Sequence, residues 1–258
     1  MRALRILLAL LAVLLVVMAV VMWTLPASLA WRMAGSRLPV LQLQGIDGTV
    51  WHGSAAAASV AGQPLGRLAW DLAPAPLLKG EVRANVNIDG PLLQAQGMVS
   101  RLPDGRIDIR DAHAQSAAEP LRQALGLGAL RPLGTLTADV REASIRNAWF
   151  ETLDAVTDWR EAGFAGAAQV HFGDIHTDFM LDDQHRVLGD ILDNGNGPLD
   201  VQGEFQAEPA GYLLNVRLAA RHADDWQTQE ALQQLGQRQP DGSVLLRVEG
   251  RLLGNPWR

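Results

Sequence analysis

The chain has 258 residues, a formal net charge of −6 and no cysteine, with 48% hydrophobic and 19% charged residues. The absence of cysteine excludes disulfides, thiol catalysis, cysteine-based metal sites and a lipid anchor on cysteine. Lys and Arg do not cluster beyond the N-terminus, which disfavours nucleic acid as a partner because phosphate binding needs concentrated positive charge. The apolar content suffices for a packed core, and the length fits one large β domain or two smaller units.

The N-terminus carries an unbroken apolar run, Ile6 to Trp23, preceded by Arg2 and Arg5. Residues 6–25 are long enough to cross the ~30 Å hydrocarbon core of a bilayer as a helix. The leading arginines favour a cytoplasmic N-terminus. We therefore predict a cytoplasmic stretch at 1–5, a transmembrane signal anchor at 6–25, and a periplasmic location for the bulk of the chain in a Gram-negative cell.

Two interpretations of this segment compete. The stretch Ser28-Leu29-Ala30 offers small residues at the positions that a signal peptidase prefers, so a cleaved signal peptide is the alternative. The apolar run, however, exceeds the ~7–15 residues of a usual signal-peptide core. Trp23 and Trp31 near its outer end also suit the interfacial aromatic belt of a retained helix. We favour the retained anchor.

Strand-like sequence dominates after a linker and first strand at residues 26–44. Two alternating runs, Gly48–Val60 and Leu65–Leu72, flank a Gly-Gln-Pro-Leu-Gly turn and predict an opening β-hairpin. Pro74 and Pro76 end it, because proline cannot donate to a strand ladder. Further alternating runs, separated by turn signals, are Glu81–Asp89, Arg106–Arg110, Thr135–Ile145, Gln202–Ala207, Tyr212–Ala219 and Val244–Leu252. They indicate antiparallel meanders with one polar and one buried face.

Two segments break this alternation, Ala118–Leu127 and Asp224–Gly236. The first has leucines at helical spacing, and the second has Asp residues that suit an N-cap and a glycine at its end, so both predict short helices. The predicted fold class is therefore mainly β: an N-terminal transmembrane helix followed by a curved antiparallel sheet.

An internal repeat is visible in the β domain at 45–258. Gly90–Gly97 resembles Gly197–Gly203, and the glycines and prolines that follow keep one constant offset. Each copy then continues through a strand, a short helix and a Gly-led strand. We predict two similar units, at about 45–133 and 134–258, joined in one long sheet.

Reactive side chains are not arranged for catalysis. His171 and His176 stand near Asp174 and Asp178, but their spacing fits neither a helix face nor a strand face, so we interpret them as surface turn residues. Asp182–His185 is interpreted as a solvated turn. No serine lies in a Gly-x-Ser-x-Gly motif, and no glycine-rich phosphate loop occurs. We predict a protein that is not an enzyme and has no cofactor or metal; an exported enzyme is the disfavoured alternative.

Eight tryptophans against one tyrosine is an unusual balance. Trp51, Trp70, Trp149 and Trp159 fall in strand-like contexts, where packing on the sheet is the favoured role and ligand stacking is the alternative. A long sheet with an apolar concave face could also hold lipid acyl chains, or receive a partner strand along an unpaired edge.

The segment from 48 to 80 carries a resemblance to a known family. Its motif residues are Gly48, Thr49, Val50, Trp51, His52, Gly53, Leu68, Ala69, Trp70, Asp71, Leu72, Pro74, Pro76, Leu77, Leu78 and Gly80. With the apolar N-terminus, the length and the Gly-led strands, these residues make the chain resemble protein N of the bacterial type II secretion system.

The resemblance implies a single-pass inner-membrane protein that is not an enzyme. It would be an accessory part of the machine that moves folded proteins from the periplasm across the outer membrane. The implied partners are the other inner-membrane platform proteins, and the family offers no catalytic residues to carry over. The fold also looks like the β-groove sheets of AsmA-type proteins, which implies lipid binding or lipid transfer in the envelope as the alternative function.

Overall fold

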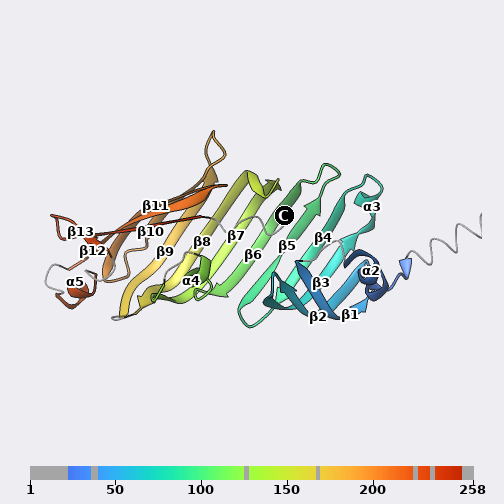
Figure 1. Ribbon diagram of the computed structural model, residues 1–258, viewed down its shortest axis with the longest axis horizontal. Coiled ribbons are helices and arrows are strands. Elements are labelled where there is room, and N and C mark those ends of the chain that lie inside the picture. Colours follow the sequence, from blue (N-terminus) through green and yellow to red (C-terminus); the bar gives the residue numbers. More distant parts are fainter. Residues whose placement is uncertain are drawn as a thin grey trace, which may run out of the picture.

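The computed structural model describes residues 23–35, 40–124, 128–166, 169–222, 226–232 and 236–251. Within these ranges the chain forms one fourteen-stranded sheet in which neighbouring strands are antiparallel (Figure 1). The strand order follows the chain from β1 to β12 and then ends β12–β14–β13. The prediction of a mainly β fold built as an antiparallel sheet is confirmed.

The strands are β1 (Leu41–Gly48), β2 (His52–Val60), β3 (Gln63–Ala73), β4 (Val82–Asp89), β5 (Leu93–Arg101), β6 (Ile107–Ala117), β7 (Arg131–Arg146), β8 (Trp149–Ala165), β9 (Gln169–Leu181), β10 (Val187–Asp193), β11 (Leu199–Glu208), β12 (Gly211–Ala220), β13 (Gln237–Arg238) and β14 (Val244–Gly250). The helices are α2 (Ala27–Ala34), α3 (Pro74–Leu77), α4 (Leu121–Ala124) and α5 (Trp226–Leu232).

The opening hairpin differs in detail from its prediction. Its turn is Ala61–Gly62, where both residues have positive φ, so Val60 pairs directly with Gln63. The segment 63–66, predicted as the turn, belongs to β3. Pro64 is accommodated there because the β2–β3 ladder is irregular between Ala58 and Ser59, next to the proline.

The predicted first strand of that hairpin is also divided in two. Residues 49–51 form a turn that separates β1 from β2. The side chain of Thr49 forms hydrogen bonds with the backbone of His52 across this turn. These local bonds take the place of the strand-to-strand hydrogen bonds that a continuous strand would form here. The first strand predicted within residues 26–44 is therefore observed as β1, which extends to Gly48 and lies at the edge of the sheet.

The helices are short and lie at the margins of the sheet. α4 and α5 fall inside the two segments predicted to be helical. α3 was not predicted: Pro74 ends β3 as expected, but its fixed φ also suits the first position of a helix. The predicted transmembrane segment at 6–25 lies almost wholly outside the described residues. Within the described ranges, no helix is long and apolar enough to span a bilayer.

Strand pairing creates one apolar row across the sheet. Residues that face one another across successive ladders form this row, and all of them are uncharged: Ile46, Ala55, Leu68, Ile88, Ala95, Ala114, Ala138, Thr157, Thr177, Ile191, Gly203, Val216 and Leu246. We call the side of the sheet that carries this row the apolar face.

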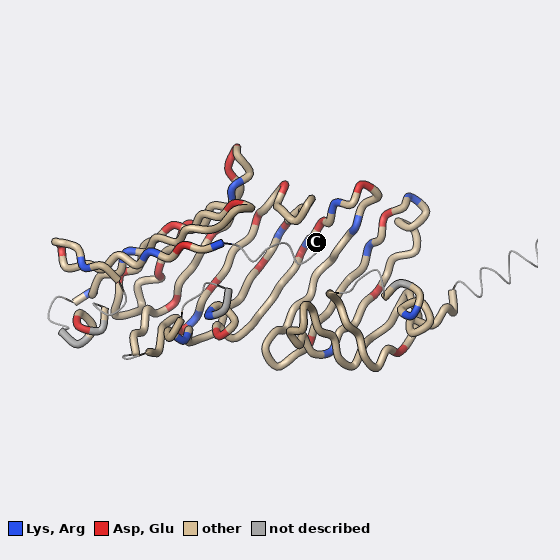
Figure 2. The backbone as a smooth tube through the Cα atoms, in the orientation of Figure 1, with Lys and Arg blue, Asp and Glu red and all other residues tan. Residues whose placement is uncertain are grey.

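The neighbouring residues in each strand form a polar row on the opposite side, because successive side chains alternate. This row is Asp47, Ser54, Ala69, Asn87, Gln96, His113, Asp139, Val156, Asp178, Asp190, Glu204, Asn215 and Arg247. Figure 2 shows acidic and basic residues interspersed along the strands and loops that the structure describes. The contrast between the rows gives the sheet two chemically distinct sides.

Burial of the apolar face changes along the sheet. From β1 to β6 its residues are mostly half-buried, as the alternating exposure of β4 and β5 shows. From β8 onward two clusters of buried side chains cover it. The first cluster contains Ala162, Phe164, Val170, Phe172, Ile175, Leu199, Val201, Val216, Leu218, Leu232 and Val244. The second contains Val187, Ala207 and Tyr212, with Trp149, Phe150, Leu153, Phe179, Leu181, Phe205 and Val248 packed against them.

Irregular ladders accompany the curvature of the second half. The β7–β8 ladder shifts register at three places and the β8–β9 ladder at two, including a step between Trp159 and Ala162. Such bulges bend a strand and increase its twist. β11 contacts β9 as well as its partners, and α5 contacts both β9 and β12. The sheet therefore curls so that its own strands cover part of the apolar face.

Two pairs of glycines occupy matching places in the two halves. Gly66 lies against Gly90 and Gly173 lies against Gly197, at the same separation along the chain. A Cβ on Gly173 would stand 2.7 Å from the Cα of Gly197, too close for any side chain. The elements from β3 to β7 also recur in order from β9 to β14, with α5 in the place of α4. The two similar units at 45–133 and 134–258 stay a prediction.

The first core cluster should dominate the stability of the sheet. Leu199 is fully buried within it, whereas Leu192, one strand earlier, is 53% exposed. We expect Leu199→Ala to lower the free energy of unfolding by about 2–5 kcal/mol, because the lost contacts leave a cavity. Leu192→Ala is the matched control and should change it by less than about 0.5 kcal/mol. Urea titration measures both, and equal effects of the two substitutions would contradict this account of the core.

Candidate functional site

The first candidate is a corner formed by the motif residues around the β1–β2 turn. The Thr49 hydroxyl accepts a hydrogen bond from the backbone N–H of His52 at 3.1 Å, and the N–H of Thr49 donates to the carbonyl of His52 at 2.9 Å. The Leu72 N–H donates to the carbonyl of Trp51 at 2.7 Å. The turn is therefore fixed both internally and to β3.

This corner also holds the last residues of the predicted membrane anchor at 6–25 and Pro26, which follows it. The N–H of Val50 donates to the carbonyl of Leu25 at 3.0 Å, and Pro26 forms an isolated bridge with Thr49. Trp51 is 5% exposed and stacks on Trp23 with ring centroids 5.8 Å apart. The start of the described chain is thus attached to the first turn of the sheet by backbone and side-chain contacts.

Trp70 and Gly53 form a single packing unit in this corner. The indole N–H of Trp70 donates to the carbonyl of Val50 at 3.0 Å. A Cβ on Gly53 would overlap the Trp70 ring and stand 2.7 Å from the carbonyl oxygen of Thr49. Only glycine leaves room for the ring. The sequence predicted that Trp51 and Trp70 pack on the sheet. The Trp70 ring lies against Gly53 of β2, whereas Trp51, in the β1–β2 turn, is buried and stacks on Trp23.

The remaining motif residues are not gathered in the corner. Leu68 lies in the apolar row, while Pro74 and Leu77 belong to α3. Leu78 is 92% exposed. Gly80 has positive φ and lies against Pro103. The motif therefore combines residues with evident packing roles and one exposed leucine for which the structure shows no packing role.

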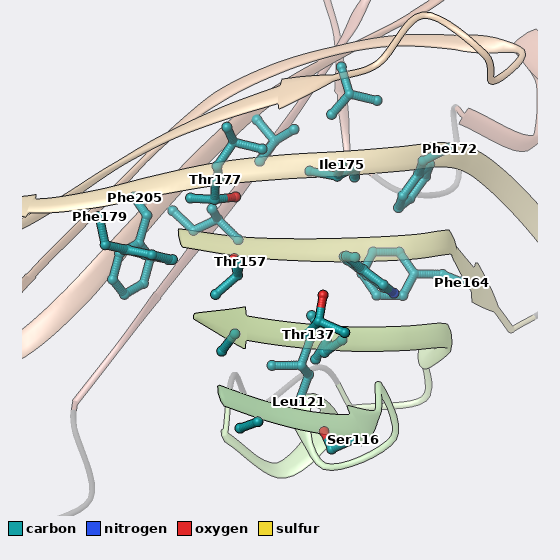
Figure 3. A pocket seen from close by; sticks show the side chains of 18 of the residues that line it. Ser116, Leu121, Thr137, Thr157, Phe164, Phe172, Ile175, Thr177, Phe179 and Phe205 are labelled. Carbon is teal, nitrogen blue, oxygen red and sulfur yellow. The ribbon is translucent and has the colours of Figure 1, made fainter. Parts of the chain in front are cut away.

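The second candidate is a cavity of about 430 Å³ on the apolar face, lined by residues of strands from β5 to β14. Figure 3 shows side chains from neighbouring strands around it, including Phe164, Ile175, Thr177 and Phe179. Leu121 of α4 lines it on the side of β6 and β7. Among the residues that the structure describes, no charged side chain lines the cavity.

Aromatic contacts set the shape of the cavity. Trp159 contacts Phe164 and Phe172 edge to face, with ring centroids 5.7 and 6.2 Å apart, and its indole N–H donates to the carbonyl of Leu133 at 2.6 Å. Phe179 meets Phe205 in the same way at 5.8 Å. Edge-to-face pairs are favourable beyond their buried area and hold the rings in fixed orientations. The walls are therefore built as a rigid apolar shell.

Most of these lining residues were missed from the sequence. The chain has five phenylalanines, and all lie after residue 149, four of them around the cavity: Phe164, Phe172, Phe179 and Phe205. The concentration of phenylalanine in the second half of the chain could have been recognised from the sequence. What could not be read was the register that brings them together, because it depends on bulges in β8 and β9.

The histidines of β9 correct the sequence interpretation. His171 and His176 lie in a strand, not a surface turn. The β8–β9 ladder is irregular next to Gly173, and both histidines lie on the polar side of the sheet. His176 Nδ1 is 2.7 Å from Asp158 Oδ1, and its Nε2 is 3.4 Å from Asp178 Oδ2.

Hydrogen bonding to Asp158 raises the pKa of His176 above 6.5, against a smaller opposing effect of burial. The two carboxylates bind opposite nitrogens of one ring, so the three groups do not converge on a common point. Within the described ranges, no group of three or more His, Cys, Asp or Glu could hold a metal ion.

Two further ion pairs lie at turns between strands. The pKa of Asp241 is lowered, first by the hydroxyl of Ser243 and then by Arg217. Asp182 accepts from the N–H groups of Gln184 and Arg186 and pairs with the Arg186 guanidinium at 2.6 Å. These contacts fix turns at the ends of hairpins, and Asp182–His185 is a turn as expected.

The described residues thus form an antiparallel sheet with an apolar cavity on one face. The profile of the family described as type II secretion system, protein N, matches residues 39–247, from before β1 into β14. The chain therefore belongs to that family, as the residues of the 48–80 segment predicted.

Two relatives carry the same name. The type II secretion system protein N of Aeromonas hydrophila is 26% identical over 234 residues, which cover 88% of this chain and 91% of the relative. The type II secretion system protein N of Vibrio cholerae serotype O1 is 40% identical over 70 residues, which cover 26% of this chain and 28% of the relative. No solved structure matches the chain.

Truncating Trp70 should destabilise the β domain. We expect Trp70→Ala to cost about 3 kcal/mol of unfolding free energy, the lower end for a buried tryptophan, because the ring is only half-buried. Trp70→Phe keeps much of the packing and loses the bond to Val50, so its cost should be smaller. Urea unfolding of both variants provides the measurement. Wild-type stability in Trp70→Ala, together with lost partner binding, would make the corner a contact surface instead.

The His176–Asp158 pair should stabilise the fold more in acid. Since the folded pKa of His176 is raised, its contribution is fully present below the unfolded value near 6.5 and is lost as pH rises through the folded pKa. Both side chains are more than 40% exposed, so solvent screening keeps the effect small.

Unfolding experiments on wild type, His176→Gln and Asp158→Asn should show this dependence. We expect each substitution to reduce stability more at about pH 5.5 than at about pH 8.5. The double variant should lose little more than either single variant, because both remove the same interaction. A loss that is constant with pH, or greater in base, would refute the assignment.

Proposed function

We propose that this chain is a non-enzymatic component of the type II secretion machinery, held in the inner membrane by one helix at 6–25, with its sheet in the periplasm. The observation that carries the proposal is the family match, which runs from residue 39 to residue 247 and so includes nearly the whole sheet. In this role the chain supports export of folded proteins from the periplasm across the outer membrane.

The described structure is consistent with a role in contact rather than chemistry. Its titratable groups pair across ladders and turns, as His176 with Asp158 and Arg217 with Asp241. Fourteen hydrogen-bonded strands give a long surface with one polar and one apolar side. We propose that this surface contacts periplasmic segments of the other inner-membrane platform subunits.

The corner around Trp51 supports the proposed topology. Residues 23–26, at the outer end of the predicted anchor, are attached to the β1–β2 turn through Trp23, Leu25 and Pro26. With a membrane helix at 6–25, the sheet would begin directly at the membrane surface. Exposed Leu78 on the same motif segment is our candidate for a partner contact, since burial does not account for it.

Lipid handling in the envelope is the second candidate function. The apolar cavity, lined by residues of strands from β5 to β14, favours it, because an apolar space of about 430 Å³ falls in the range of small-molecule sites, roughly 300–1,000 Å³.

The secretion role predicts a defect in export. Deleting the gene in its Gram-negative host should retain substrates of the type II pathway in the periplasm and reduce recovery of the platform complex. Expression of the wild-type chain should restore both. Substrate distribution between medium and periplasm, and affinity recovery of platform subunits from crosslinked membranes, provide the measurements. Normal export together with an unchanged platform complex would overturn the proposal.

Complementation with Leu78→Glu tests whether Leu78 contacts a partner subunit, separately from any role of this residue in folding. The side chain is exposed, so the variant should fold with wild-type stability and still recover fewer platform subunits. Leu92→Glu is the control, since Leu92 is also exposed but lies outside the motif. Equal recovery by the two variants would remove Leu78 from the contact while leaving the secretion role intact.

A further inference from the structure

We propose that the cavity binds one acyl chain of a bilayer phospholipid, and that this chain reaches the cavity along the part of the apolar row in β1–β6. The assignment rests on the lipid-handling candidate and is independent of the secretion role.

The side chains that line the cavity favour a hydrocarbon ligand over a charged one. Its walls are aromatic and aliphatic, and the polar side chains among them are uncharged: Gln115, Ser116, Thr137, Thr157 and Thr177. A phosphate or carboxylate placed inside would lose its hydration without gaining a charge partner, which is costly. The headgroup of an amphiphile therefore remains outside, and only its acyl part enters.

A polypeptide does not suit the same space. An extended segment brings N–H and C=O groups that need partners, whereas the strands that floor the cavity use theirs in their own ladders. A helix is about 10–12 Å wide and rises 1.5 Å per residue, so about 430 Å³ holds at most roughly one turn. A hydrocarbon chain carries no group that requires a hydrogen bond.

The cavity is closed at both borders of the sheet. The first core cluster fills one border, where α5 contributes Leu232 at 1% exposure. The second cluster fills the opposite border around Tyr212 and Val187. The cavity extends instead toward β5 and β6, where Leu93 and Ala114 line it. This is the side from which an acyl chain enters.

The apolar row continues from that side to the first strand. Its residues on β1–β6 are uncharged, and several are small, as Ala55, Ala95 and Ala114 are. No opposing layer of the described chain covers β4 and β5, so their apolar residues stay half-buried. The row ends on β1, which contacts α2 just after the predicted membrane segment. A bilayer is therefore the source of the chain.

Photolabelling of the full chain in vesicles tests this assignment. The vesicles contain phosphatidylethanolamine and phosphatidylglycerol, with a trace of phospholipid that carries a diazirine at the end of one acyl chain. After illumination and digestion, mass spectrometry should find the label on peptides that contain Phe179, Phe205 or Leu214. Loss of that label should follow Thr157→Phe, because the added ring occupies the cavity.

Matched variants separate the cavity from general effects. Val156→Phe alters the adjacent residue on the polar row and should keep the label. Ala138→Phe narrows the cavity from β7 and serves as the second filling variant if Thr157→Phe unfolds, as judged by urea titration. Ile88→Asp places a charge on the row outside the cavity. It should slow labelling from vesicles but not from detergent micelles, whereas Asn87→Asp on the polar row should change neither.

The outcomes distinguish the proposals. Label confined to the N-terminal segment or to β1–β4 would overturn the cavity assignment and leave lipid handling standing. Retained label in a folded Thr157→Phe or Ala138→Phe protein would overturn it as well. Equal vesicle labelling of Ile88→Asp and wild type would overturn the entry route. Labelling no higher than in a sample kept dark would remove both the site and lipid handling, without bearing on secretion.

Discussion

The structure depends on keeping apolar and polar side chains in register through thirteen strand pairings. A slip of one residue in any hairpin would move a whole strand's apolar set to the polar side. The long strands meet this constraint with local irregularities, such as positive φ at Asp111 and Glu161, which absorb an extra residue without disturbing the row. The tight approach of Gly173 to Gly197 also holds β9 close to the loop between β10 and β11.

A sheet of one layer has no opposing sheet to cover its apolar side, and the two halves solve this differently. The second half curls until its own aromatic residues meet, which leaves an apolar cavity around Trp159 and Phe205. The first half stays open. It is attached at its far end to the segment before α2 through Trp51 and Val50. The molecule thus joins an attachment point, an open apolar surface and an apolar cavity in one continuous sheet.

The sequence was informative wherever the signal was local. Period-2 runs, turn residues and the two helical segments led to the right class of fold, and the motif from Gly48 to Gly80 led to the right family. Places where a local feature interrupts a strand pattern were harder to predict. Thr49 bonds to the backbone and makes a turn inside a strand pattern, and Pro64 enters β3 beside an irregular ladder.

Non-local geometry could not be read from one sequence. The shared side of His171 and His176 arises from a strand irregularity near Gly173, which reverses the simple alternation rule. The cavity depends on how β9, β11 and α5 come together as the sheet curls, and no single segment encodes that curvature. The prediction of a transmembrane anchor at 6–25 rests on the sequence alone.

The strand order has a consequence for how the protein is made. Each strand from β2 to β12 pairs with the strand just before it, so the growing sheet always offers one completed edge to the next segment of chain. Such nearest-neighbour pairing avoids the entropy of closing long loops and favours rapid assembly. A chain emerging from a translocation channel could therefore build this sheet strand by strand from β1, without waiting for its C-terminus. Only β13 and β14 depart from this order, because β14 pairs with β12 and β13 pairs with β14.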